Sequence, residues 1–149
     1  MAISEKDLLL ALSNEEPQYL EILAKLDEKA IAYLSTLSKA KDVMLATKAI
    51  YLAGLYSKPS GHAIVESAAK STVLLKRIAS ASVLEHMPEE KRDMIAEKLI
   101  DDADISLQKL VIKATGSSKS VKLKAKFAKL SKDSSSKFIR DLIKERQKP

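Results

Sequence analysis

The apolar positions of this chain recur in sets about 31 residues apart. One position is occupied, at spacings of 30, 32 and 31 residues, by Leu45, Leu75, Leu107 and Phe138. The positions four and five residues later form two further rows, Ala49, Ala79, Val111 and Leu142, and Ile50, Ser80, Ile112 and Ile143. Offsets of four and five residues fall on one face of an α-helix. Each set therefore predicts a helix with one buried face.

A second group of rows precedes the first. Eight residues before each anchor stand Leu37, Ser67, Leu99 and Leu130, and eleven before stand Leu34, Ile64, Ala96 and Phe127. Short polar stretches separate the two groups, so each unit is predicted to be a pair of helices joined by a turn. The predicted helices span residues 28–38 and 42–56, 60–69 and 72–86, 89–100 and 104–115, and 119–131 and 135–147.

Local signals support these divisions. The connectors SKPSG (57–61), MPEE (87–90) and GSSKS (116–120) separate the units. Gly54 and Gly116, nine residues after an anchor, mark places where a helix bends or ends. Asp102 or Asp104 is expected to cap one helix, and the segment 134–136, three serines, another. Lysines alternate with other residues over 121–127, which a strand would also produce, and helix is preferred there because the repeat predicts one.

The first 26 residues are predicted to form a pair of short helices. Ser4 is expected to cap the first, with Asp7 favourable in its first turn. The inward side chains of this helix are expected to be Leu8, Leu9 and Leu12. The second is expected to start near Pro17, with its inward face made by Leu20, Leu23 and Ala24.

Two helices per period of about 31 residues are typical of an α-solenoid, in which stacking completes the core. The predicted fold is all-α: a short right-handed α-solenoid of about four helical-hairpin repeats in a single domain, 1–149. The N-terminal capping pair is 1–26, and the repeats are 28–57, 58–87, 88–116 and 117–149. The alternative is an irregular helical bundle with a chance spacing. Three Gly and four Pro provide few of the turns that an all-β fold needs.

The second helix of each unit resembles that of the HEAT-repeat family, which commonly reads Asp, two residues, Val-Arg, two residues, Ala, and a Leu-Gly end. The residues that match are Asp104, Leu107-Gln108, Val111, Ala114 and Gly116, and, in another copy, Asp42, Leu45-Ala46, Ala49, Leu52 and Gly54. The position that usually carries a ladder-forming Arg holds Ala46, Lys76, Gln108 and Ile139. The resemblance covers roughly residues 28–116 and implies a scaffold that binds protein partners; armadillo-like repeats are the alternative.

Charge divides the chain unevenly. Residues 107–149 contain thirteen Lys or Arg and three Asp or Glu, a net +10, whereas the whole chain is +6 and residues 1–106 are therefore −4. Basic residues also recur two and six positions after the anchors. If the second helices line one surface, the candidate binding residues on it are Tyr51, Arg77, Lys109, Lys113, Arg140 and Lys144.

These residues favour a non-enzymatic scaffold that binds an acidic protein surface or peptide. The alternative partner is nucleic acid, contacted through its phosphates because aromatic residues for base stacking are only 4% of the chain. A third interpretation is that the lysines only solvate exposed helix faces. Four more lysines, spaced to form a stripe on the predicted helix 119–131, are Lys119, Lys122, Lys126 and Lys129.

Nothing in the sequence predicts catalysis, a cofactor or a metal. With no Cys, disulfides and thiolate sites are excluded. His62 and His86 lie 24 residues apart without a local partner. The acidic group Glu97, Asp101, Asp102 and Asp104 is better explained by helix capping than by a metal site. No signal peptide and no apolar run of about 20 residues is visible, so a cytoplasmic protein without membrane contact is expected, as a monomer or a weak homodimer.

Overall fold

The computed structural model describes residues 2–148 and is all-helical, with 71% helix and no strand in that range. The all-α class is therefore confirmed. The α-helices are α1 (Glu5–Leu12), α2 (Tyr19–Leu23), α3 (Glu28–Leu37), α4 (Val43–Tyr56), α5 (Pro59–Ala69), α6 (Leu74–Ser82), α7 (Glu89–Leu99), α8 (Ile105–Thr115), α9 (Val121–Asp133) and α10 (Lys137–Arg146). A short 3₁₀ helix, η1 (Leu84–His86), follows α6.

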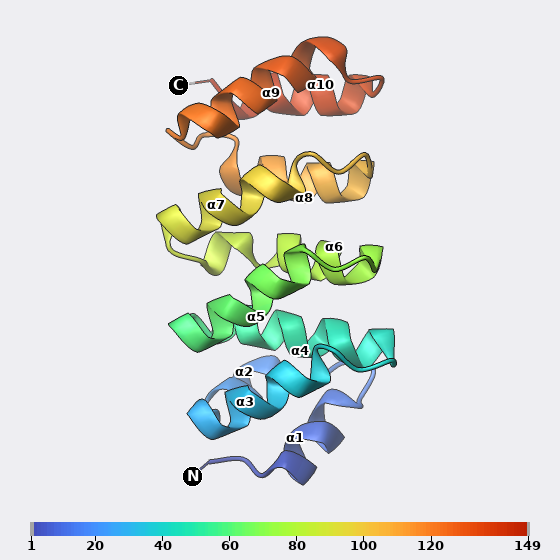
Figure 1. Ribbon diagram of the computed structural model, residues 1–149, viewed down its shortest axis with the longest axis vertical. Helices are drawn as coiled ribbons and strands as arrows, with labels where there is room; N and C mark the ends of the chain where they lie inside the picture. The colour runs from blue at the N-terminus through green and yellow to red at the C-terminus, as the bar shows by residue number, and fades with distance from the viewer. Residues whose placement is uncertain (1, 149) are drawn as a thin grey trace.

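The helices are stacked along the long axis of the molecule, from the N-terminus at the bottom of Figure 1 to the C-terminus at the top. They form two layers. In one, α3 contacts α5, α5 contacts α7 and α7 contacts α9; in the other, α4 contacts α6, α6 contacts α8 and α8 contacts α10. The turns that join α3 to α4, α5 to α6, α7 to α8 and α9 to α10 lie on the right edge in Figure 1. The N-terminal ends of α4, α6, α8 and α10 therefore share one long edge.

Side-chain caps start most of these helices. Ser4 Oγ accepts from the backbone N–H of Asp7 at 3.1 Å, which confirms the predicted first cap. Asp104 and Ser136 cap α8 and α10, within the segments predicted to provide those caps. At Asp27, Asp42 and Ser120 the side chain likewise accepts a hydrogen bond from the backbone N–H of the third following residue. Each such cap contributes about 1 kcal/mol.

The core lies between the layers in two clusters of mainly aliphatic side chains, both of which include residues of α5 and α6. The rows predicted four and five residues after the anchors are all buried, from Ala49 and Ile50 in α4 to Leu142 and Ile143 in α10. Ser80 is the polar member of these rows, and its hydroxyl donates to the carbonyl oxygen of Val65 at 3.0 Å. That bond removes the cost of burying the hydroxyl and joins α6 to α5.

The anchor row itself was predicted wrongly at two of its four positions. Leu107 is fully buried and Leu45 packs against the core, but Leu75 is 49% exposed and Phe138 is 51% exposed. The N-caps lie at Asp42, Val73, Asp104 and Ser136. Counted from these caps, Leu45 and Leu107 are third, whereas Leu75 and Phe138 are second. One residue turns a helix by about 100°, so both side chains point out of the core.

Three smaller expectations were also wrong. The predicted helix 72–86 is interrupted, because α6 ends at Ser82 and η1 follows after Val83. Gly54 does not end α4; it lies within the helix, and a Cβ there would stand 2.5 Å from Val83 Cβ. Ser67 is exposed, and the neighbouring Ala68 is buried in its place. By contrast, Gly116 does end α8, as its C-cap.

The short helix α2 differs from its predicted form, whereas the lysine-rich helix α9 matches its predicted form. α2 begins at Tyr19, two residues after Pro17, and it buries Ile22, while Leu20 is 78% exposed and Ala24 is also exposed. Leu23 packs against the core, so the predicted inward face of α2 was wrong at two of its three positions. α9 is a helix, which resolves the helix–strand ambiguity around 121–127 in favour of helix. No helix within residues 2–148 is long and apolar enough to cross a membrane.

Candidate partner-binding surface

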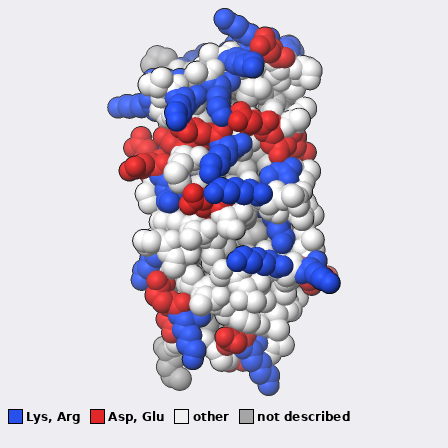
Figure 2. Space-filling view, in the orientation of Figure 1, with Lys and Arg blue, Asp and Glu red and all other residues white. Residues whose placement is uncertain are grey.

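The six candidate binding residues all belong to the layer made of α4, α6, α8 and α10. Helices α4, α6 and α8 together contain no Asp or Glu; their five basic residues are Lys48, Lys76, Arg77, Lys109 and Lys113. The opposite layer mixes both signs. Figure 2 shows this mixture as red and blue side chains crowded over the upper part of the molecule. The two layers therefore differ in charge, and only the layer that carries the candidates is predominantly basic.

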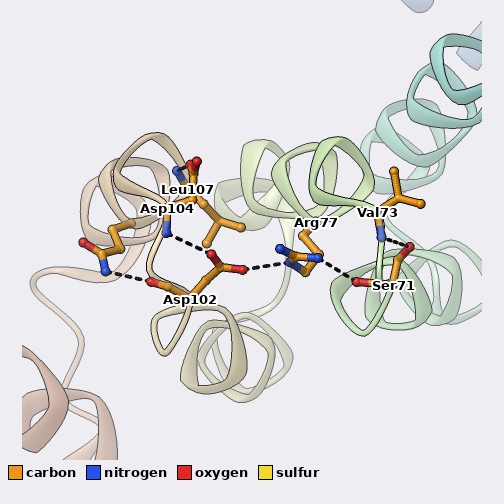
Figure 3. A network of polar contacts seen from close by, with 7 residues as sticks. Ser71, Val73, Arg77, Asp102, Asp104 and Leu107 are labelled. Carbon is orange, nitrogen blue, oxygen red and sulfur yellow. Dashed lines mark hydrogen bonds and ion pairs between the residues drawn. The ribbon is translucent and has the colours of Figure 1, made fainter.

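Arg77 is engaged within the fold. Its Nε donates to Asp102 Oδ2 at 2.8 Å, and its Nη1 donates to the carbonyl oxygen of Ser71 at 3.0 Å. Figure 3 shows the guanidinium lying between these two partners. The side chain is 23% exposed and that of Asp102 is 19% exposed, so the ion pair is largely shielded from water. Arg77 therefore links α6 to the turn before α8 and has little capacity left for a partner.

Arg140 makes an equivalent bond in the last hairpin. Its Nη1 donates to the carbonyl oxygen of Ser134 at 2.5 Å, and Gln108 Nε2 donates to that of Asp102 at 2.7 Å. Arg77, Gln108 and Arg140 are each fourth after an N-cap, and each bonds the carbonyl six residues earlier. The same position in α4 is Ala46. The predicted register of α6 and α10 is one residue too early, so the sequence pattern assigns Lys76 and Ile139 to this position in place of the two arginines.

Tyr51 is only partly buried but is held by an aromatic contact. Its ring meets that of Tyr19 edge-on, with centroids 4.8 Å apart and an interplanar angle of 70°. Burial, and secondarily the proximity of Tyr51, raise the pKa of Tyr19 above its ordinary value. The pair joins α2 to α4, and this contact of residues 32 apart has no local signal in the sequence.

Three candidates remain available to a partner. Lys113 and Lys144 are exposed. Lys109 Nζ lies 5.7 Å from the centroid of the Phe138 ring, within range of a cation–π interaction. In the part of the chain that the structure describes, none of the three forms an ion pair with a carboxylate. These lysines are on α8 and α10, so the structure groups them in the upper half of the layer.

The six candidates do not form one straight row. Arg77 and Arg140 are fourth after their caps, whereas Lys109 is fifth and Lys113 is ninth after Asp104. A difference of one residue corresponds to about 100° around the helix. The arginines therefore serve the hairpin turns, while the α8 lysines are displaced around the helix toward α10.

The two histidines have different surroundings, since His62 is buried and His86 is exposed. Within residues 2–148, no group of three or more potential metal-ligating side chains lies close enough to hold an ion. His62 is 6% exposed, and its Nε2 has no hydrogen-bond partner among residues 2–148. Burial, and then the positive charge of Lys91, lower the pKa of His62. His86 is exposed, with Nε2 3.9 Å from Glu85 Oε1.

One group of surface residues was not anticipated. Large apolar side chains are exposed in the first turns of the basic layer's helices: Met44, Leu74, Leu75, Ile105 and Phe138. A sequence signal does exist for two of them, because Met44 and Ile105 directly follow the start of a helix capped by Asp42 or Asp104. A residue one or two positions after an N-cap precedes the first residue of the helix that points into the core.

The chain matches no protein-family model and no curated protein. Arguments about its function therefore depend on the charge and exposure of the two layers.

Proposed function

We propose that this protein is a non-enzymatic scaffold that binds an acidic protein partner through the layer of α4, α6, α8 and α10. The observation that carries the proposal is the absence of any Asp or Glu from α4, α6 and α8, together with exposed lysines on α8 and α10 that form no ion pair within residues 2–148. Such a surface attracts carboxylates and repels basic proteins. The proposal assigns no catalytic residue, cofactor or metal.

We further propose that the architecture is a short right-handed α-solenoid of four HEAT-like hairpins, with α1 and α2 as an N-terminal capping pair. The N-caps of the second helices support this proposal, because Asp42, Val73, Asp104 and Ser136 are 31, 31 and 32 residues apart. So does the hydrogen bond that recurs from Arg77, Gln108 and Arg140. Repeats that contact only their neighbours would provide an extended surface.

Charge reversal tests the binding proposal. The double variant Lys109→Glu and Lys113→Glu is expected to bind a fluorescein-labelled oligoglutamate peptide at least about tenfold more weakly at about 50 mM salt, where charge interactions are little screened. The measurement is fluorescence anisotropy. Lys113 is exposed and Lys109 is half-buried beside Phe138, so the helical circular dichroism signal should be unchanged and the melting temperature should fall only slightly, through loss of the cation–π contact.

The matched control is Lys122→Glu with Lys129→Glu, which makes the same charge change at exposed positions of α9 in the other layer. Equal weakening by both double variants would mean that only net charge matters, and the assignment of the surface would be wrong. No detectable binding by the unaltered protein at low salt would remove the proposal itself.

Nucleic acid is the alternative partner, and the five lysines of α9 favour it in addition to the basic layer. Lys126 is not free, because its Nζ donates to Glu97 O at 2.7 Å and to Asp101 Oδ2 at 2.8 Å. Phe127 is buried and Tyr51 contacts Tyr19, so contacts would go to phosphates. Tight, salt-sensitive binding of a short DNA duplex in the same anisotropy assay, without binding of oligoglutamate, would favour this alternative.

A further inference from the structure

Exposed apolar side chains are concentrated on one edge of the molecule. Eight large hydrophobic residues of the described chain are exposed, and five of these lie in the first turns of α4, α6, α8 and α10. We call these five the edge row: Met44 (60% exposed), Leu74 (36%), Leu75 (49%), Ile105 (47%) and Phe138 (51%). The edge that they occupy is the right edge in Figure 1, where the N-terminal ends of all four helices lie.

The edge row is more regular than scattered surface hydrophobicity. Each member is first or second after an N-cap, and α4, α6, α8 and α10 contact one another in that order. Single exposed apolar residues are common on soluble proteins, but an aligned series is characteristic of an interaction surface. The residues that follow in each helix already fill the core, so the edge row is not needed for folding.

The charges beside the edge row are of both signs: next to Ile105 lie Asp101, Asp102 and Asp104, of which Asp101 is ion-paired with Lys126 and Asp102 with Arg77. The carboxylates of Asp42 and Asp104 each accept a backbone N–H of the helix they cap. By contrast, Lys76 follows Leu75 in sequence, Lys137 precedes Phe138, and neither lysine has an ion-pair partner within residues 2–148. The edge therefore combines apolar contacts with cations available to carboxylates.

The spacing of the row suits a helical partner. Packed helices are about 8–10 Å apart, so successive members of the row recur at about that interval. An α-helix rises about 10.5 Å in seven residues. One apolar residue per heptad of a docked helix would therefore lie opposite each successive helix of the edge. A second copy of this chain is a poorer fit, because it would bring the lysines of two edges together.

We propose that the edge row docks an amphipathic, acidic helix of a partner protein, with its apolar stripe on Met44, Leu75, Ile105 and Phe138. This inference rests on the proposed function, since it specifies the acidic partner and adds an apolar contact beside the basic layer. The carboxylates of the docked helix face Lys76, Lys109 and Lys137.

Two designed peptides test the proposal against the full-length protein. Each has about four heptads; one carries Leu at the first and fourth heptad positions and Glu at most others, and the second has Gln in place of every Leu. The Leu peptide should bind, and the Gln peptide should bind at least about tenfold more weakly. The double variant Leu75→Gln and Phe138→Gln should lose the same factor for the Leu peptide.

The control variant is Leu20→Gln with Val121→Gln, which removes apolar side chains that are 78% and 81% exposed outside the edge row. It should bind as the unaltered protein does. Circular dichroism checks folding, and Ile105→Gln alone provides a second variant should the double variant misfold. Its binding loss should be smaller but in the same direction.

The outcomes separate this proposal from the more general one. Equal binding of both peptides, unaffected by the edge variants but weakened by Lys109→Glu with Lys113→Glu, would overturn the edge row and leave the acidic-partner scaffold standing. If neither peptide binds, both the edge-row proposal and the acidic-partner scaffold are overturned. If the Leu peptide fails to bind and analytical ultracentrifugation shows a dimer that the edge variants dissociate, the occupant is a second copy and the proposal is wrong.

Discussion

The α4–α5 contact and the α7–α9 contact join neighbouring helices by different physical means. At the first, the backbones nearly touch: a Cβ on Gly61 of α5 would collide with the carbonyl oxygen of Ala53 in α4. At the second, polar groups connect the helices. Ser118 Oγ, in the turn before α9, donates to Asp93 Oδ2 at 2.7 Å, and Lys126 of α9 bonds Glu97 O of α7.

The sequences of the helices explain the difference. α5 has one charged residue, Glu66, and is otherwise small or aliphatic apart from His62 and two serines, so it can approach closely. α7 carries four acidic residues and α9 carries five lysines, which cannot be buried without partners. The stack is therefore built on close packing in its middle and on specific polar pairs nearer the C-terminus. Substitutions that affect volume should act at the first contact, and substitutions that affect pairing at the second.

The largest effect is expected from Gly61→Ala. In an exposed helix this change would stabilise by about 1 kcal/mol through helix propensity. Here the new methyl group meets backbone, which cannot rotate away, and overpacking of this kind costs about 1–3 kcal/mol. The net result should be a lower free energy of unfolding, measured by urea denaturation. Ser67→Ala, at an exposed site on the same helix, should be neutral or slightly stabilising; a gain at Gly61 would show that α4 and α5 can separate freely.

The second effect, of similar or smaller size, is expected from Asp93→Ala. Asp93 and Ser118 are both buried, and Asp93 Oδ1 also accepts from Arg92 Nε at 3.0 Å. Removing the carboxylate leaves the buried hydroxyl of Ser118 without its acceptor, which costs about 1–3 kcal/mol. Asp93→Asn retains an acceptor oxygen and should lose less in the same urea titration. Equal losses would mean that the charge, and not the bond to Ser118, stabilises the contact.

Much of this framework was predictable because helix starts and buried rows have local signals. Asp104 and Ser136 cap helices where polar residues precede an apolar run. Ala49 and Val111 each lie four residues after an anchor, on the same face of a helix. The register of α6 was not predictable in this way. Val73 occupies the N-cap without a capping side chain, so no side-chain cap marks where α6 starts. The third position after this cap, where Leu45 and Leu107 stand in α4 and α8, is Lys76, and the apolar pattern therefore points to Leu75, one residue earlier.

The candidate site was predictable by residue type but not by role. Lys109 and Lys113 follow from charge and spacing. The engagement of Arg77 depends on Asp102, 25 residues away in the chain, and only the stacking of hairpins brings the two together. The exposure of Phe138 has a different origin, because α10 starts after Ser136 and the second residue after that cap points out of the core.

The smallest effect on stability is expected from a change at His62, a buried residue of α5 that is influenced by the charge of Lys91 in α7. A lowered pKa means that the folded protein binds a proton at His62 less readily than the unfolded chain does. The contribution of this residue to stability is thus complete above the ordinary histidine pKa of about 6.5 and is lost as the pH falls from there through the folded-state pKa. Urea midpoints measured at about pH 7.5 and about pH 5 should differ less in His62→Leu than in the unaltered protein. His86→Gln, at an exposed histidine, should keep the full difference. If His62→Leu also kept it, the acid sensitivity would not arise from this buried imidazole.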